Sequence, residues 1–135
     1  MFPKKANKPQ GRIDSLIGAG TRVNGSVTFT GGLRVDGEIK GNVSASDEQP
    51  STLVVSENAC IEGEISVSHL VINGTVIGPV FSSGYLELQS LARVTGDLQY
   101  NNIEIHLGAV VQGRLVHQGV VTTGKTQELK LASSN

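Results

Sequence analysis

A five-residue unit, aliphatic-x-Gly-x-aliphatic, recurs along this chain and constrains its fold more than any other feature. Self-similarity at a short period is typical of proteins that stack one structural unit on the next. Successive glycines of the main series lie 16, 15, 18 and 17 residues apart, with one longer step of 22 residues that contains the segment 44–51. We interpret 44–51 as an insertion in one repeat. The eight copies are Val23–Val27, Val35–Ile39, Ile39–Val43, Ile61–Ile65, Ile72–Val76, Val76–Val80, Val94–Leu98 and Val111–Leu115.

The spacing within each unit predicts a strand with one buried face. The two aliphatic residues and the glycine share parity, so on a strand of period two they point to the same side, and the polar residues between them point outward. We expect the glycine to face the core, where a missing side chain lets the backbone bend or approach a neighbour. Short alternating stretches at 32–35, 69–72, 85–88 and 102–105 supply further strands between the units.

Several short strands in each period of about 17 residues, with no helical segment between them, predict an all-β, single-stranded parallel β-helix, or solenoid. Six coils begin near residues 23, 39, 61, 76, 94 and 111. Stacked at about 4.8 Å per coil, they form a rod of roughly 29 Å. Val, Ile and Leu supply 37 of the 135 residues, which suits a core of pleated strands. A β-sandwich is the weaker alternative, because the Asn-Gly pairs lie inside the repeat and not between antiparallel partners.

The charge pattern divides the chain into three segments. Residues 1–12 carry a net charge of +4, whereas residues 13–135 hold 7 basic and 12 acidic side chains. Pro3, Pro9 and Gly11 disfavour helix and strand in the first segment. We therefore predict a disordered basic leader at 1–16, a β-helix domain at 17–121 and a disordered C-terminal arm at 122–135. The chain has a single cysteine, no signal-peptide pattern and no apolar run of about 20 residues. We therefore expect the protein to reside in a reducing cytosol.

The two ends of such a stack determine what it can do. The first and last coils present unpaired backbone groups and an open apolar core, which soluble repeat proteins normally cap. No capping segment is apparent in the sequence, so we expect end-to-end addition into a filament. The residues expected at these contacts are Val23, Val27 and Phe29 in the first coil, and Val110, Val111 and Leu115 in the last. Phe29 is assigned equally well to the core or to the end contact.

The repeated units, the doubled units at 35–43 and 72–80, and a leader with Phe2, Lys4 and Lys5 resemble the bactofilin family of bacterial cytoskeletal proteins. The resemblance covers about 100 residues. It implies a right-handed, three-sided β-helix with disordered arms, and non-polar filaments that form without nucleotide. It also implies attachment to the inner face of the cytoplasmic membrane and a scaffold role in cell shape, envelope growth or the positioning of other proteins. Many bactofilins carry a phenylalanine just before the last glycine unit, where this chain has Val110 and Val111.

This resemblance implies three partners and no cofactor. The partners are further copies of the chain, the membrane surface, and cell-envelope or morphogenesis proteins that the sequence does not identify. Phe2, Lys4, Lys5 and Lys8 are the residues expected to bind the membrane, since each lysine near an anionic leaflet contributes about 1 kcal/mol. The alternative for this segment is a solubilising arm. The acidic body argues against nucleic-acid binding.

An oligomeric β-helical enzyme is the main alternative function, either a hexapeptide-type acyltransferase or a relative of the gamma-class carbonic anhydrases. Such enzymes need histidine as a general base or as a zinc ligand. The candidates are His69, His106 and His117, which we expect to be surface or corner residues without a carboxylate at ligand spacing. Cys60 is expected to point outward or to lie at a corner, in line with Arg22, Arg93 and Val110. A binding module that does not polymerise is a third possibility, but it leaves the open ends unexplained.

Overall fold

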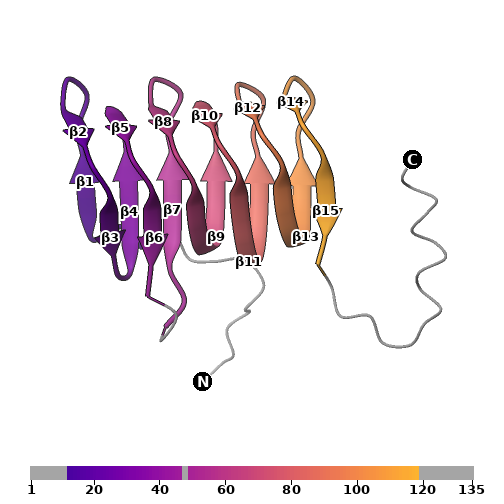
Figure 1. Ribbon diagram of the computed structural model, residues 1–135, viewed down its shortest axis with the longest axis horizontal. Coiled ribbons are helices and arrows are strands. Elements are labelled where there is room, and N and C mark those ends of the chain that lie inside the picture. The colour runs from indigo at the N-terminus through magenta and orange to yellow at the C-terminus, as the bar shows by residue number, and fades with distance from the viewer. Residues whose placement is uncertain (1–11, 47–48, 119–135) are drawn as a thin grey trace, which may run out of the picture.

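The computed structural model describes residues 12–46 and 49–118, and every regular element within these ranges is a β-strand. Each strand pairs in parallel with strands one coil before or after it, so the chain winds as a β-helix (Figure 1). The parallel solenoid predicted from the glycine repeat is thereby confirmed. No helix in the described part of the chain is long and apolar enough to cross a membrane.

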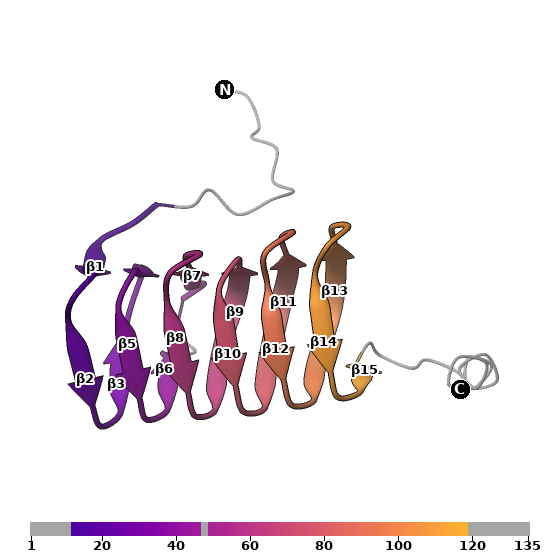
Figure 2. The same cartoon turned by 90° about the horizontal axis from the view of Figure 1, so that it is seen from above.

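The strands form three faces around a common core (Figure 2). Face A consists of β2 (Arg22–Asn24), β5 (Glu38–Lys40), β8 (Cys60–Glu62), β10 (Thr75–Ile77), β12 (Arg93–Thr95) and β14 (Val110–Gln112). Face B consists of β3 (Val27–Phe29), β6 (Val43–Ala45), the first halves of β9 (Ile65–Ile72), β11 (Val80–Leu88) and β13 (Leu98–Ile105), and β15 (Leu115–His117). Face C consists of β1 (Ser15–Ile17), β4 (Gly32–Val35), β7 (Thr52–Val55) and the second halves of β9, β11 and β13.

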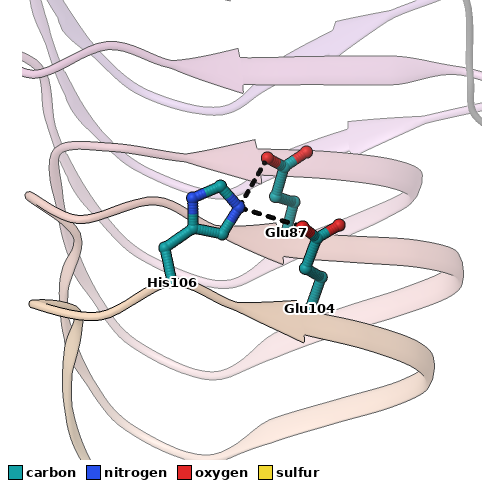
Figure 3. A group of neighbouring side chains, drawn as sticks. All are labelled: Glu87, Glu104 and His106. Carbon is teal, nitrogen blue, oxygen red and sulfur yellow. Dashed lines mark hydrogen bonds and ion pairs between the residues drawn. The ribbon is translucent and has the colours of Figure 1, made fainter.

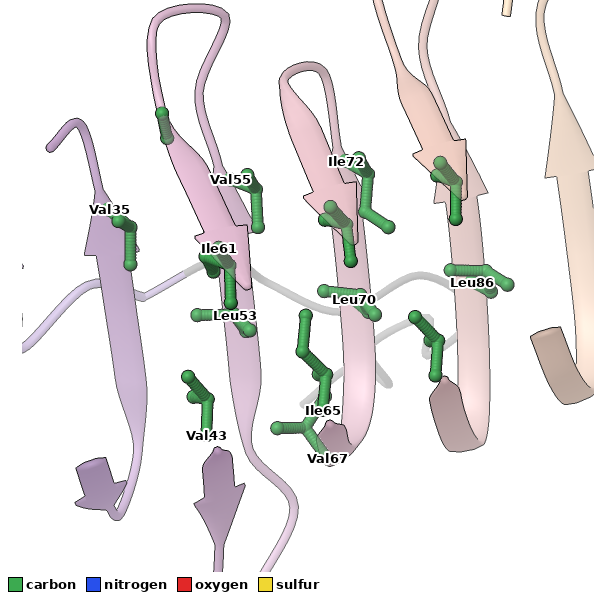
Figure 4. Close-up of a cluster of buried hydrophobic side chains, with 14 of the residues drawn as sticks. Val35, Val43, Leu53, Val55, Ile61, Ile65, Val67, Leu70, Ile72 and Leu86 are labelled. Carbon is green, nitrogen blue, oxygen red and sulfur yellow. The ribbon is translucent and has the colours of Figure 1, made fainter. Parts of the chain in front are cut away.

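The core is built from ladders of aliphatic side chains, one from each coil, stacked in register (Figure 4). Because the strands are parallel and in register, equivalent inward positions lie directly above one another. In the interior coils these side chains are at most 3% exposed. Face A contributes Val23, Ile39, Ile61, Val76, Val94 and Val111. Face B contributes Val27, Val43, Ile65, Val80, Leu98 and Leu115. Face C contributes Ile17, Val35, Val55, Ile72, Leu88 and Ile105, and beside them Leu33, Leu53, Leu70, Leu86 and Ile103.

The coil positions agree with the sequence prediction, while two boundaries differ from it. Face A has six strands, one at each predicted coil start. The inserted loop is shorter than 44–51, because β6 continues to Ala45 and leaves only 46–51 between β6 and β7. At the N-terminal side, β1 begins at Ser15, two residues before the expected start of the domain at residue 17, because Ser15 pairs with Leu33 of β4. The expected boundary at residue 121 and the arm at 122–135 lie outside the described residues.

A column of glycines forms the corner between faces A and B. Gly25, Gly41, Gly63, Gly78, Gly96 and Gly113 each follow a face A strand and have positive φ angles between 135° and 159°. A Cβ atom on Gly78 would lie 2.2 Å from the carbonyl oxygen of Gly63 in the preceding coil. The absent side chain therefore points at the neighbouring coil and not into the core, which corrects our expectation that these glycines face inward. The expected close backbone approach is present.

Two of the eight glycine units belong to a different corner. Gly37 and Gly74 lie between faces C and A, each in a two-residue connection, and their φ angles are not positive. A Cβ atom on Gly74 would lie 2.1 Å from the carbonyl oxygen of Ser56 in the preceding turn. In the other coils this corner is a four-residue turn such as Ser56 to Ala59, closed by a backbone hydrogen bond of 2.9 Å. The doubled units at 35–43 and 72–80 are therefore two adjacent corners of one coil.

We predict that Gly78→Ala destabilises the fold much more than Gly25→Ala. Both positions have positive φ, which costs about 1–3 kcal/mol for alanine. A Cβ atom on Gly25 meets nothing within 4 Å, whereas one on Gly78 meets the Gly63 backbone. In Gly78→Ala the coil must therefore shift, which adds about 1–3 kcal/mol to the loss of folding stability. The free energy of unfolding, measured by urea titration with circular dichroism, checks the difference; equal losses in the two variants would show that contact between coils at this corner is unimportant.

Candidate functional site: the open ends of the solenoid

The two end coils expose the core ladders that the interior coils bury. In an end coil, the side chain that belongs to a ladder has a ladder neighbour in one adjacent coil only, and its other side is open. Leu115 is 45% exposed and Ile105 is 47% exposed, although their equivalents one coil earlier, Leu98 and Leu88, are fully buried. This difference arises from position in the stack, since all four residues are aliphatic and of similar size. Apolar side chains exposed together in this way are typical of a protein contact surface.

The N-terminal end is formed by β1, β2 and β3. Each of these strands pairs with a single neighbour among the described residues, so its outer edge keeps free backbone groups. Val23 and Val27 are half-buried at this end, and Phe29 points inward with an exposed fraction of only 9%. Ile17 also lies at the end of its ladder and is half-buried. The structure therefore places all three predicted first-coil residues in the coil that is open to a partner.

The C-terminal end is formed by β14, β15 and the second half of β13. Val110 is 41% exposed, Val111 is half-buried, and Leu115 lies beside them. Sequence reasoning missed Ile103 and Ile105, which end the two ladders of face C. Their alternating stretch was recognised as a strand, but its place in the last coil follows only from the register with β11. The coil register could have revealed it, because Ile105 lies 17 residues after Leu88.

Polar side chains hold the last coil against the one before it. The backbone N–H of Arg114 donates to Asp97 Oδ1 at 3.0 Å, and the guanidinium donates to Oδ2 at 3.2 Å. These two interactions lower the pKa of Asp97 below its ordinary value. His117 Nε2 lies 3.0 Å from the Asn101 carbonyl oxygen, and its ring lies 5.6 Å from that of Tyr100. These polar contacts hold the last coil in register with the coil before it.

On face C, His106 lies between two carboxylates, contrary to our expectation that none is near it. Its Nε2 atom is 3.1 Å from Glu87 Oε2 and 3.1 Å from Glu104 Oε2 (Figure 3). Glu104 is two residues away, and Glu87 is its ladder neighbour in the preceding coil. The Tyr85 hydroxyl donates to Glu104, which raises the pKa of Tyr85 to about 12. The prediction failed because the Glu87 contact depends on coil register.

The same three side chains could hold a divalent cation, since one ligand atom from each lies within 4.8 Å of the others. Carboxylate oxygen and imidazole nitrogen are suitable ligands for zinc and similar ions. The separations of 3.1 Å from the imidazole nitrogen are also those of hydrogen bonds, so an ion-paired cluster accounts for the arrangement without a metal. Gln89 Nε2 donates to the same Glu87 oxygen at 3.2 Å.

His69 is half-buried at the start of the second half of β9, under a bulge in β11. The ring lies against Gly84, where an added Cβ atom would come within 2.8 Å of Cε1. The register of β11 shifts between Ser82 and Tyr85, which places the glycine over the imidazole. Nδ1 is buried without a hydrogen-bond partner, and burial lowers the pKa of His69. Within 12–46 and 49–118, the three histidines do not converge on one metal-binding group.

Cys60 occupies the position predicted for it. The ladder on face A runs through Arg22, Glu38, Cys60, Thr75, Arg93 and Val110. The thiol is half-buried, and burial raises its pKa. Its neighbour Ala59 points inward and is 2% exposed, as the parity predicts.

The predicted membrane-binding residues Phe2, Lys4, Lys5 and Lys8 lie outside the described part of the chain. Their role therefore stays a prediction.

Comparison with known proteins gives one family. Residues 15–116 match the family described as bactofilin, polymer-forming cytoskeletal. The chain is 26% identical over 112 residues to bactofilin BacP of Myxococcus xanthus, an alignment that covers 83% of this chain but 45% of that protein. It is 28% identical over 102 residues to bactofilin BacO of the same organism, with 76% of this chain and 78% of BacO covered. No solved structure matches the chain.

We predict that His69 makes the fold less stable as the pH falls below about 6.5. Its folded pKa is lower than its unfolded pKa, so the unfolded chain binds the proton first and is favoured at lower pH. His69→Thr, which introduces the residue found at the paired position Thr52, should flatten the dependence of unfolding free energy on pH between 5 and 7. His117→Gln, at an exposed histidine, is the control. If the unfolding free energy of His69→Thr depends on pH as steeply as that of the wild type, the His69 ring does not cause the loss of stability at low pH.

Proposed function

This chain belongs to the bactofilin family of polymer-forming cytoskeletal proteins, and from this premise we propose that it polymerises end to end into filaments that scaffold other proteins. The observation that supports end-to-end addition is the exposure of the same ladder positions at both ends of the stack. Val23 and Val111 end one ladder, and Val27 and Leu115 end another. A second copy placed on either end would continue the ladders and bury them.

Two interactions would stabilise such a contact. Exposed strand edges can pair with the edge of another copy, as in recognition by strand addition. Two aliphatic residues that end core ladders at the C-terminal end, Ile105 and Leu115, are 47% and 45% exposed, and complete burial of such a side chain contributes about 1.5–3 kcal/mol. The same backbone pairing and packing hold adjacent coils together within one molecule. We therefore propose that assembly requires no nucleotide.

We propose non-polar filaments, in which like ends meet. A contact between two identical ends is self-complementary, because a two-fold axis relates the two copies and every contact of residue i with residue j is repeated as j with i. If N-terminal ends meet each other and C-terminal ends meet each other, the filament has no direction. The match to a polymer-forming family supports self-association of the chain.

We further propose that the filament is cytoplasmic and lies on the inner face of the cytoplasmic membrane, bound through Phe2, Lys4, Lys5 and Lys8. One leader with a single aromatic side chain and three lysines binds weakly. A filament that displays many leaders gains from effective concentration, so polymerisation and membrane binding reinforce one another. Cell-envelope or morphogenesis proteins are the proposed clients of this scaffold.

Leu115→Arg should prevent filament formation, because it places a charge where the apolar ladder would continue. Leu91→Arg is the matched control: Leu91 is 47% exposed, close to the 45% of Leu115, but it lies in the turn between β11 and β12, away from the last coil. Electron microscopy without nucleotide should show filaments for the control and short particles for Leu115→Arg, with β-rich circular dichroism in both. Val111→Glu tests the neighbouring ladder. Normal filaments from both Leu115→Arg and Val111→Glu would place the contact elsewhere.

Deletion of residues 1–8 should release filaments from anionic liposomes without shortening them, because it removes the leader and leaves both end coils intact. Flotation with liposomes measures binding, and microscopy measures filament length. Neutral phosphatidylcholine liposomes provide the control for the charge contribution of the lysines. Flotation of the truncated protein to the same extent as the full chain would contradict the proposed role of the leader.

A further inference from the structure

His117 occupies the last position in a row of inward-pointing side chains on face B. It pairs with Tyr100, which in turn pairs with Ser82, a residue only 3% exposed. His117 itself is exposed, because β15 pairs with β13 alone among the described strands. A second copy stacked on this end would therefore cover the imidazole. The complete row is Phe29, Ala45, Val67, Ser82, Tyr100 and His117.

One hydrogen bond defines the neutral form of the His117 ring. Its Nε2 atom lies 3.0 Å from the Asn101 carbonyl oxygen. A carbonyl oxygen only accepts hydrogen bonds, so Nε2 carries the hydrogen of the neutral ring. Within 12–46 and 49–118, Nδ1 makes no hydrogen bond. Nδ1 is therefore the atom that takes up a second proton and gives the ring a positive charge.

The carboxylates nearest in sequence to His117 are bound to other groups. Residues 93–118 contain two of them, Asp97 and Glu104. Asp97 accepts from the backbone and the guanidinium of Arg114, and Glu104 pairs with His106. In the part of the chain that the structure describes, both ion pairs of a histidine belong to His106. No counter-charge is thus held beside the His117 ring.

The elements packed against His117 supply no negative charge either. On β13 its neighbour is the Tyr100 ring at 5.6 Å, a phenol. On β14, residues 110–112 are two valines and a glutamine, none of which titrates. The other basic group of these coils, Arg93, donates to the Gly108 carbonyl oxygen at 3.3 Å, at the corner between faces C and A. A charge on His117 would therefore lie among apolar ladder ends.

The N-terminal end has no histidine at the corresponding positions. Its inward residues are serine, aliphatic residues and phenylalanine, none of which titrates in this range. The charged groups of the first coil form exposed pairs, Arg12 with Asp14 and Arg22 with Glu38 of the next coil. Carboxylates and guanidinium groups ordinarily keep their charge between about pH 5.5 and 7.5. The two ends therefore differ in their response to acid. The inward residues are Ser15, Ile17, Val23, Val27 and Phe29.

From these observations we propose that His117 is a pH switch in the contact between C-terminal ends, which opens when this ring is protonated and leaves contacts between N-terminal ends intact. The switch rests on the proposed function, since it regulates the end-to-end contact. A neutral ring can be covered by a second copy, whereas burial of an unpaired charge is costly. The two-fold axis brings one ring from each copy, so two positive charges would enter one contact. Acid should divide the filament into dimers joined at their N-terminal ends.

Proton linkage gives the direction and size of the effect. If the contact excludes the protonated ring, each copy releases a proton when two C-terminal ends associate, so association weakens as the pH falls. The association constant then falls by up to about tenfold per pH unit for each copy, and by up to about a hundredfold for the pair. The change belongs to the range of about pH 5 to 8, where histidine ordinarily titrates.

Two variants separate the two kinds of contact. Val27→Arg places a charge on the N-terminal end only, and Leu115→Arg places one on the C-terminal end only. Each variant should therefore form dimers through its intact end. Sedimentation equilibrium at about pH 7.5 and 5.5 measures their dissociation constants. We expect Val27→Arg dimers to weaken about tenfold or more in acid and Leu115→Arg dimers to change less than about twofold. Circular dichroism at each pH verifies folding, and Val23→Arg replaces Val27→Arg if the latter unfolds.

His117→Gln in the Val27→Arg background tests the residue itself. Glutamine keeps an N–H donor for the Asn101 carbonyl oxygen but cannot be protonated. This variant should dimerise equally well at both pH values. The matched control, His106→Gln, makes the same change at an outward position of face C and should keep the acid response. Acid weakening of the His117→Gln dimer equal to that of its parent would overturn the switch.

Failure of the switch and failure of the proposed function give different results. Stable dimers of both variants whose dissociation constants do not change with pH would leave end-to-end assembly in place and overturn the switch. If Val27→Arg and Leu115→Arg stay monomeric alone and associate only when mixed, opposite ends meet, and both proposals in their like-end form are wrong. Electron microscopy of the full chain completes the test: wild-type filaments should shorten at about pH 5.5, and His117→Gln filaments should not.

Discussion

Close stacking of one coil on the next is the constraint on which the rest of this structure depends. Each coil must approach its neighbour at strand-pairing distance around its whole circumference, including the corners, where side chains would otherwise keep the backbones apart. At the corner between faces A and B this approach is possible because the Cβ position of each glycine from Gly41 onward is filled by the carbonyl oxygen of the glycine before it. The aliphatic ladders can fill the interior only because this spacing is kept.

The same constraint distinguishes the two ends of the solenoid from its interior. A coil in the interior satisfies its backbone and its ladder residues on both sides, whereas an end coil satisfies them on one side. Leu98 and Leu115 occupy equivalent positions, yet Leu98 is buried and Leu115 is 45% exposed. The forces that hold coils together within one chain are therefore available between chains. In the filament that we propose, end-to-end assembly would repeat between chains the stacking that folds each chain.

The outward faces are free to vary, because stacking constrains only the inward positions and the corners. On face C one outward row runs through Leu16, Arg34, Val54, Val71, Glu87 and Glu104. This row is apolar in the middle and ends in the cluster of Glu87, Glu104 and His106. On face C, residues about 17 positions apart in the sequence become neighbours on adjacent coils. Charged side chains can therefore be arranged in rows along the axis of the solenoid.

The sequence by itself determined the solenoid, the number of coils and the inward positions. These depend on local spacing: parity assigned Ala59 and the ladder residues to the core, and equal steps between units placed Cys60 in line with Arg22 and Arg93. The tertiary structure alone decided which corner each glycine occupies, so that Gly37 and Gly74 separate from the main column. It also decided that Glu87 meets His106. Contacts between coils depend on the length of every turn in between, and the turns between faces C and A have two residues in some coils and four in others. Periodicity within one strand contains no information about that register.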